Sequence, residues 1–346
     1  MNNLRWIKLY FIFPIIIIFS IFSINYIIDP YSMTNYNILN IPNKFARDDR
    51  VEKVSKLKTS PRYDNIILGS SRVYSSNPLM VSKYLGGETY NAGVGTARVE
   101  DHLGFVLLLQ RLGKLPKNLI LGLDFYSFNS ELETNKYFLK NKDLNFLNQQ
   151  LSQENYLSNF LSIDAFRASY KTLKNFLKNK KSNPRFDENG ASQNASKIFS
   201  YYPEVQSMKP KFSKTTIDKE IQFIKTISYS KISKKRIAYL QRIIDICKQE
   251  DINLYLFLTP LNGELISKIQ SEQNLYKKLQ TLKNIIATKT SYYDFIQHSK
   301  INDDTIYFNN PTHATPIGGN LIYAKIFNDP KITLPKNFGE FIKVIN

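Results

Sequence analysis

The sequence predicts an α/β protein of three layers, with a mostly parallel sheet between two layers of helices, preceded by one transmembrane helix. Short apolar runs, typical of buried strands, alternate with amphipathic segments of helical period. Several of these runs end in glycine or polar residues, as buried strands commonly do. An uncharged apolar segment precedes all of them. Alternating strands and helices require crossover connections, which make neighbouring strands parallel and put helices on both faces of the sheet.

The N-terminal apolar segment predicts the membrane helix. Residues 9–28 contain no charged side chain, and at ~1.5 Å per residue they would span the ~30 Å hydrocarbon core of a bilayer. Arg5 and Lys8 lie before the segment, which favours a cytoplasmic N-terminus. The run is long for a signal peptide and no small-residue cleavage site follows it. We therefore expect residues 1–28 to be a single-pass inner-membrane anchor, with the remaining chain in the periplasm or outside the cell.

The remaining chain divides into a connector, one large domain and a tail. Residues 29–62 are polar and predict a loosely structured connector, and residues 331–346 a C-terminal tail. The α/β domain is expected over residues 63–330, interrupted by a lysine- and asparagine-rich helical insertion over 130–230. Its predicted strands are 65–68, 88–92, 119–125, 253–258 and 291–295. Its predicted helices are 78–84, 99–112, 232–250, 265–288 and 316–327.

Composition excludes some classes of site and partner. The net charge is +18, but the lysines are scattered, which favours compositional drift over a binding surface. The functional interpretation is attraction to an anionic partner, such as lipid head groups or an acidic envelope polymer. An outward-facing domain makes nucleic acid a poor candidate. Cys247 is the only cysteine, which excludes an internal disulfide and a cysteine-rich zinc site. No cofactor or metal is expected.

Candidate site residues follow the predicted strands, because the sites of parallel sheets lie beyond the carboxyl ends of the strands. The segments there are Gly69–Arg72, Asn91–Gly95, Asp124–Phe125 and Asn309–His313. A serine at a strand-to-helix turn suits a nucleophile. Of the three histidines, His102 lies within a predicted helix and His298 in a polar loop, which leaves His313 as the candidate base.

These segments, in this order, resemble the sequence blocks of SGNH/GDSL hydrolases. Gly69-Ser70-Ser71 stands where those proteins carry Gly-Asp-Ser, and Gly122-Leu123-Asp124 where they carry Gly-x-Asn. Asn91–Gly95 is similar to their second block, whose glycine lends a backbone N–H, and Asn310–His313 to their Asp-x-x-His. The resemblance implies a flavodoxin-like fold, a nucleophile at Ser71 and a base at His313. It also implies that Asn310 orients the base, and that oxyanion donors lie at Ser71, Gly93 and Gly95.

Several positions depart from the family pattern or leave alternatives open. Ser70 rivals Ser71 as the nucleophile. The Asn310 carbonyl can accept the imidazole N–H but lacks the charge that would stabilise imidazolium, so Asp303 or Asp304 could take that part. Asp124 replaces an oxyanion-donating asparagine. With Arg72 and Arg98 it is a substrate-binding candidate, since arginine can hold a carboxylate or phosphate. A structural ion pair is the alternative for the arginines.

The anchor and the SGNH-like domain together resemble proteins that O-acylate envelope polysaccharides, such as the alginate acetylation and teichoic acid alanylation factors. This resemblance implies a membrane-anchored serine acyl-transfer protein outside the cytoplasm, acting on a cell-envelope glycan or another anionic polymer. A multi-span membrane acyltransferase is a candidate partner. The alternatives are an esterase that deacylates such a glycan and a non-catalytic SGNH-like scaffold that binds it.

Overall fold

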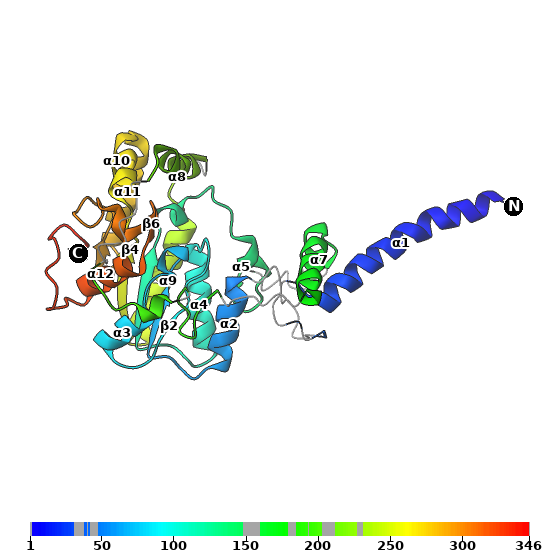
Figure 1. Ribbon diagram of the computed structural model, residues 1–346, viewed down its shortest axis with the longest axis horizontal. Coiled ribbons are helices and arrows are strands. Elements are labelled where there is room, and N and C mark those ends of the chain that lie inside the picture. The colour runs from blue at the N-terminus through cyan, green and yellow to red at the C-terminus, as the bar shows by residue number, and fades with distance from the viewer. Residues whose placement is uncertain are drawn as a thin grey trace. The chain divides into compact units, whose positions relative to one another are not determined.

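The computed structural model describes residues 2–30, 38–39, 41, 48–147, 160–178, 185–192, 194–202, 212–226 and 231–345. The chain forms two compact units (Figure 1). The first comprises residues 1–55 and 136–183, and the second residues 56–135 and 184–346. The expected insertion over 130–230 is therefore divided between the two units.

The first unit is helical in its described residues. Its helices are α1 (Asn2–Ile28), α5 (Lys136–Lys140) and α7 (Ile163–Leu177). Helices α1 and α7 are joined by the buried side chain of Asn25, which donates to the Phe160 carbonyl at 2.7 Å and accepts from the Ser169 hydroxyl at 2.9 Å. The ring of Phe160 packs edge-on against Phe22 and Tyr26 of α1.

The structure corrects the expected membrane anchor. Crossing a bilayer requires a helix of ~20 residues that is apolar along that length. Within the part of the chain that the structure describes, no helix meets both requirements. The single-pass inner-membrane location expected from residues 1–28 is therefore wrong.

The second unit contains a six-stranded sheet of order β2-β1-β3-β4-β5-β8. The first five strands are parallel, and β8 pairs antiparallel with β5 at one edge. This confirms the α/β class with a mostly parallel sheet. The expected C-terminal tail contributes the edge strand β8. The strands are β1 (Asn65–Leu68), β2 (Thr89–Asn91), β3 (Asn118–Leu123), β4 (Asn253–Leu258), β5 (Tyr292–Asp294) and β8 (Glu340–Ile342). A separate hairpin pairs β6 (Phe308–Asn310) with β7 (His313–Ala314).

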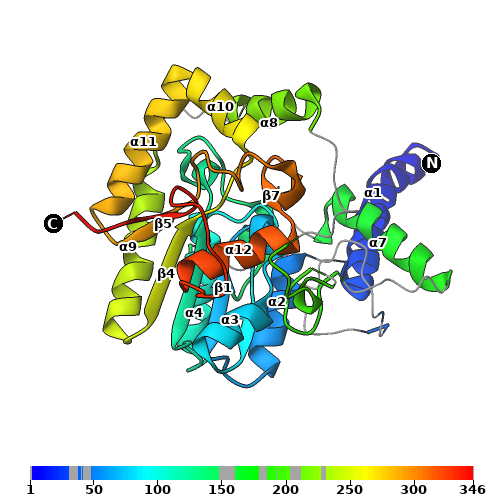
Figure 2. The same cartoon turned by 60° about the vertical axis from the view of Figure 1, so that its left-hand side comes forward.

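Helices cover both faces of this sheet. Helices α3 and α12 lie on one face and α4 and α9 on the other (Figure 2). The α-helices are α2 (Asp49–Thr59, which spans the boundary between the units), α3 (Pro78–Leu85), α4 (Val99–Arg111), α8 (Lys214–Thr226), α9 (Lys234–Gln249), α10 (Gly263–Ser271), α11 (Gln273–Ala287) and α12 (Pro316–Ile326). The 3-10 helices are η1 (Ser71–Val73), η2 (Phe125–Phe128), η3 (Ala195–Lys197) and η5 (Thr305–Tyr307).

Local sequence signals explain where these elements begin and how they pack. The side chain of Asn77 accepts the Leu79 N–H, and Pro78 occupies the first turn of α3. Thr315 and Pro316 start α12 in the same way. All residues of β1 and β3 are buried, as their continuous apolar runs predict. The face under α3 and α12 holds a core cluster of Ile67, Val73, Ile120, Phe257, Leu321 and Tyr323.

Two predicted boundaries were wrong. The single helix expected over 265–288 is two helices, α10 and α11, because Glu272 takes a non-helical conformation with φ −94° and ψ 85°. The connector expected over 29–62 contains α2, whose first turn has Asp49 and Glu52 and whose last turn has Lys56 and Lys58. This charge order complements the helix dipole, a signal that was present in the sequence.

Candidate active site

Ser71 lies at the turn that follows β1, as the first residue of η1. The turn is tight: a Cβ added at Gly69 would lie 2.6 Å from a methyl carbon of Val73 and 3.3 Å from the Gly122 carbonyl oxygen. Glycine therefore allows the chain to turn closely over β3. Ser71 remains half-buried rather than enclosed. Its backbone N–H has no hydrogen-bond partner among the described residues, which leaves a donor beside its own hydroxyl.

His313 reaches Ser71 from the β6–β7 hairpin. The Ser71 Oγ and the His313 Nε2 are 2.9 Å apart, although 242 positions separate the residues in the sequence. This is the hydrogen-bond distance required between a nucleophile and its general base. The structure therefore brings the expected pair together.

The hydrogen bonds of the hairpin favour one tautomer of the His313 imidazole. The Thr312 backbone N–H can only donate, and it contacts Asn310 Oδ1 at 3.0 Å, so that atom is the carbonyl oxygen of the amide. The same oxygen and the Thr312 hydroxyl each lie 3.0 Å from His313 Nδ1, and the carbonyl oxygen favours a proton on that nitrogen. Nε2 is left with its lone pair directed at the Ser71 hydroxyl. Asn310 thus orients the His313 ring and favours the tautomer that a general base needs.

The surroundings of His313 keep it neutral. Burial lowers its pKa to about 4, and the positive charge of Arg72 lowers it further than Asp124 raises it. A neutral imidazole is the base form, so His313 can accept a proton at physiological pH. Nδ1 faces the neutral Asn310 amide, which is consistent with this direction, because a carboxylate in its place would favour imidazolium.

Asp124 and Arg72 form a buried ion pair beside this dyad. The Arg72 Nη1 lies 3.3 Å from Asp124 Oδ1, and the two side chains are 9% and 2% exposed. The Thr259 hydroxyl donates to the same carboxylate oxygen at 2.5 Å. The guanidinium of Arg72 also lies 5.3 Å from the ring centroid of Tyr126. Asp124 is therefore the counterion of Arg72, and its role as a substrate contact stays a prediction.

The expected oxyanion donors differ in availability. The Gly93 N–H donates to Asn91 Oδ1 at 3.0 Å, so it is already engaged. Gly93 has a packing role instead, because an added Cβ would lie 2.5 Å from a methyl carbon of Val73. Gly95 follows Val94, whose N–H donates to the Gly69 carbonyl at 3.1 Å. The N–H of Ser71 is the donor best placed for an oxyanion formed at its own hydroxyl.

The rival nucleophile Ser70 is fully occupied. Its side chain is 1% exposed, accepts the Arg72 N–H at 3.2 Å and is hydrogen-bonded to the Tyr126 hydroxyl. We expect Ser70→Ala to lower the free energy of unfolding by about 1–3 kcal/mol, because it leaves buried polar groups with one partner fewer. Acyl-transfer activity should stay within about threefold of wild type. Urea denaturation and ester turnover measure the two effects, and a thousandfold loss of turnover in a folded variant would move the nucleophile to Ser70.

The two acids considered for His313 lie elsewhere. Asp304 caps η5 by accepting the Ile306 N–H at 3.0 Å. Asp303 Oδ1 lies 2.7 Å from His298 Nδ1, and His298 Nε2 lies 3.2 Å from the Ser267 hydroxyl. This surface Ser-His-Asp cluster was not expected from the sequence. Ser267 lies inside α10, where the helix uses its backbone N–H, so that N–H is not available to an oxyanion.

Arg98 is the second arginine expected at the site. Its Nε and Nη1 are buried and have no hydrogen-bond partner in the described part of the chain. Nearby Glu100 is occupied by a bidentate pair with Arg236, in which both distances are 2.9 Å. Arg98 lies one residue after Ala97, whose carbonyl accepts from the Tyr126 hydroxyl at 3.1 Å. The charge of Arg98 also interacts with Tyr126, so the guanidinium lies near the Ser70–Tyr126 side of the site.

Two site residues were missed in the sequence. Thr312 holds the Asn310 amide in place through its N–H and its hydroxyl, both at 3.0 Å. Its position inside the Asn310–His313 block was the available signal. Thr259 directly follows β4, so the rule that sites lie after strands could have identified it. Across the described residues, no group of three or more histidine, cysteine, aspartate or glutamate side chains converges as metal ligands would.

Comparison with models of known protein families gave no match, and neither did comparison with curated proteins.

Proposed function

We propose that this chain is a serine acyl-transfer enzyme on a flavodoxin-like scaffold, which moves an acyl group to a hydroxyl of a cell-envelope polysaccharide. The observation that carries the proposal is the 2.9 Å contact between the Ser71 hydroxyl and His313 Nε2. The Asn310 contact, which favours a proton on Nδ1, supports it. The resemblance of the four sequence blocks to SGNH/GDSL hydrolases agrees with it.

The proposed reaction follows from the geometry. Ser71 Oγ attacks the acyl carbonyl while its proton passes to His313 Nε2, and the Ser71 N–H stabilises the oxyanion. Collapse of the tetrahedral intermediate breaks the bond to the leaving alcohol, which takes the proton from His313. The acyl group is then an ester of Ser71. An acceptor hydroxyl gives its proton to His313 and attacks the ester. Collapse of this second intermediate breaks the bond to Ser71 Oγ, which takes the proton from His313, and releases the acylated product.

Transferase and esterase differ only in the second nucleophile, which is a glycan hydroxyl in the first case and water in the second. We prefer the transferase on the resemblance of the SGNH-like domain alone to that of envelope O-acylation proteins, with a multi-span acyltransferase as a candidate source of the acyl group. The decisive experiment incubates the protein with 4-nitrophenyl acetate and a polysaccharide. Acetate on the polysaccharide supports transfer, free acetate alone supports the esterase, and no turnover supports a binding scaffold.

Arg98 supports an acceptor that carries negative charge. Its unpartnered Nε and Nη1 provide the charge-assisted donors that carboxylates and phosphates bind. Arg72 is less suited, because Asp124 already neutralises it. The proposed acceptor is therefore an acidic polysaccharide, with Arg98 holding its anionic group.

We expect Arg98→Ala to raise the KM for an anionic acceptor by roughly tenfold or more, because charge-assisted hydrogen bonds are lost. The KM for a neutral acceptor should change little. Acetyl transfer to galacturonate and to galactose measures the difference. Arg98→Lys should restore only part of the affinity, since lysine lacks the planar fork of arginine.

The matched control for this prediction is Arg242→Ala, which removes one exposed positive charge from α9. It should leave the ratio of the two KM values unchanged. If Arg98→Ala raises both KM values equally, Arg98 does not read the charge of the acceptor.

A further inference from the structure

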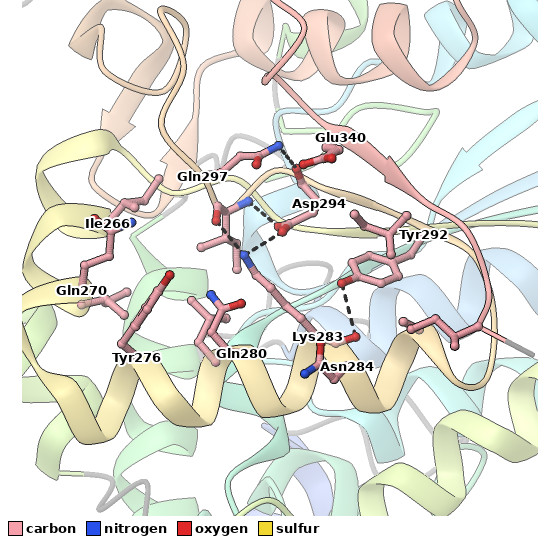
Figure 3. A pocket seen from close by; sticks show the side chains of 16 residues that line it. Ile266, Gln270, Tyr276, Gln280, Lys283, Asn284, Tyr292, Asp294, Gln297 and Glu340 are labelled. Carbon is pink, nitrogen blue, oxygen red and sulfur yellow. Dashed lines mark hydrogen bonds and ion pairs between the residues drawn. The ribbon is translucent and has the colours of Figure 1, made fainter.

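A cavity of about 350 Å³ lies in the second unit, bounded by α10, α11, β5 and β8 (Figure 3). Its volume is at the lower end of the ~300–1,000 Å³ that small-molecule sites occupy. Strands β3 and β4 separate β1, which leads to Ser71, from β5, which lines the cavity. The described residues that line it include no member of the Ser71 site. The cavity is therefore a separate candidate for ligand binding.

A buried ion pair forms part of the cavity wall. Lys283 Nζ lies 2.6 Å from Asp294 Oδ2, and the two side chains are 11% and 8% exposed. The ammonium also donates to the Ile296 carbonyl at 2.9 Å. These contacts use two of its three N–H groups. Such a pair contributes little net stability compared with apolar side chains of the same volume, so its presence beside a cavity suggests a role in recognition.

The amide side chains that line the cavity can donate and accept hydrogen bonds to a ligand. Gln270, Gln280 and Asn284 line it, and their amides have no hydrogen-bond partner within the described residues. Figure 3 shows Gln280 and Tyr276 on the side of α11 that carries Lys283 toward Asp294. Tyr276 is 37% exposed, so its ring can cover a ligand while its hydroxyl remains hydrogen-bonded to water.

Charge determines which ligand class fits. Asp294 and Glu340 are direct partners in the antiparallel β5–β8 pairing, where like charges oppose each other. Lys283 is the one cation among the described lining residues, so the cavity carries one excess negative charge in a protein of net charge +18. An anionic ligand is repelled there. Hydroxyl groups suit the lining, because each can donate to a carboxylate or accept from an amide.

The apolar part of the lining completes the match. Ile266, Ile269 and Leu279 offer a surface for the C–H face of a sugar ring, while the amides and carboxylates meet its hydroxyls. We propose that this cavity binds an uncharged sugar residue. The proposal goes beyond acyl transfer at Ser71 and does not depend on it.

The test is a titration of the full chain with glucose, galactose and N-acetylglucosamine, in which ligand-observed NMR detects binding. At least one of these sugars should bind saturably. The double variant Gln280→Ala/Asn284→Ala should weaken that binding about tenfold, because it removes two amides that can each hydrogen-bond the sugar. The control Gln273→Ala/Asn274→Ala removes two exposed amides from the same helix outside the cavity, and it should leave the affinity unchanged.

Two further variants separate this site from the Ser71 site and test its charge. Ser71→Ala should bind the sugar as wild type does, whatever its effect on turnover. Glucuronate should bind at least tenfold more weakly than glucose in wild type, and Glu340→Gln should narrow that gap. The proposal is overturned if no neutral sugar binds, if the control pair weakens binding as much as the cavity pair, or if glucuronate binds as well as glucose.

Discussion

Replacing Ser71 or His313 with alanine should lower acyl transfer by roughly a thousandfold or more, and replacing both should lower it little further. The reason is that the two side chains act as one unit across their 2.9 Å contact. Neither a serine without its base nor a base without its serine can form the acyl-enzyme. Release of 4-nitrophenol from 4-nitrophenyl acetate measures the loss, and mass spectrometry of the Ser71 peptide detects the acyl-serine directly.

The chain contains its own matched control for this prediction. Ser267 and His298 form a second Ser-His contact, and Asp303 supplies the carboxylate that His313 lacks. Ser267→Ala and His298→Ala should nevertheless leave turnover unchanged, because that cluster is exposed and the α10 helix uses the Ser267 N–H that could otherwise bind an oxyanion. If Ser71→Ala and His313→Ala keep full activity, catalysis at this site is wrong and the binding scaffold takes its place.

Replacing Asn310 with aspartate should produce pH profiles of kcat/KM that cross those of wild type. In wild type the base is lost only as the pH falls through the His313 pKa of about 4. A carboxylate at 3.0 Å from Nδ1 favours imidazolium and should raise that pKa by roughly 1–3 units. The acid limb of the profile then moves to higher pH by the same amount.

Which of the two enzymes turns over faster should therefore depend on pH. Near pH 5 the variant is largely protonated at His313 and turns over more slowly than wild type. Above its new pKa the variant should be faster by roughly tenfold, because a stronger base accepts the Ser71 proton and the carboxylate stabilises the resulting imidazolium. Ester turnover across pH 4–9 tests both limbs.

An NMR titration of the His313 ring reports its pKa without reference to turnover. Asn310→Ala is the control, since it removes the carbonyl that orients the ring without adding charge, and it should slow turnover at every pH. An unchanged His313 pKa in Asn310→Asp would show that Asn310 does not contact the imidazole as the hairpin geometry requires.

The sheet could be predicted because buried parallel strands have a strong local signal. Asn65–Leu68 and Asn253–Leu258 are apolar runs closed by turns, and both are strands with the predicted bounds. The edge strand Glu340–Ile342 has no such signal, since two of its three residues are exposed. It becomes a strand only because β5 offers it an edge.

The sequence by itself determined the α/β class, the place of the Ser71 turn and the choice of His313 among three histidines. Each depends on local pattern: strand period, turn glycines and the rule that sites follow strands. Tertiary structure alone decided that Asp124 is the counterion of Arg72 and that the Gly93 N–H donates to the Asn91 side chain. It also placed Asp303 at His298 rather than at His313. Sequence order cannot assign such partners, because they depend on which side chains the folded backbone brings within about 3 Å of one another.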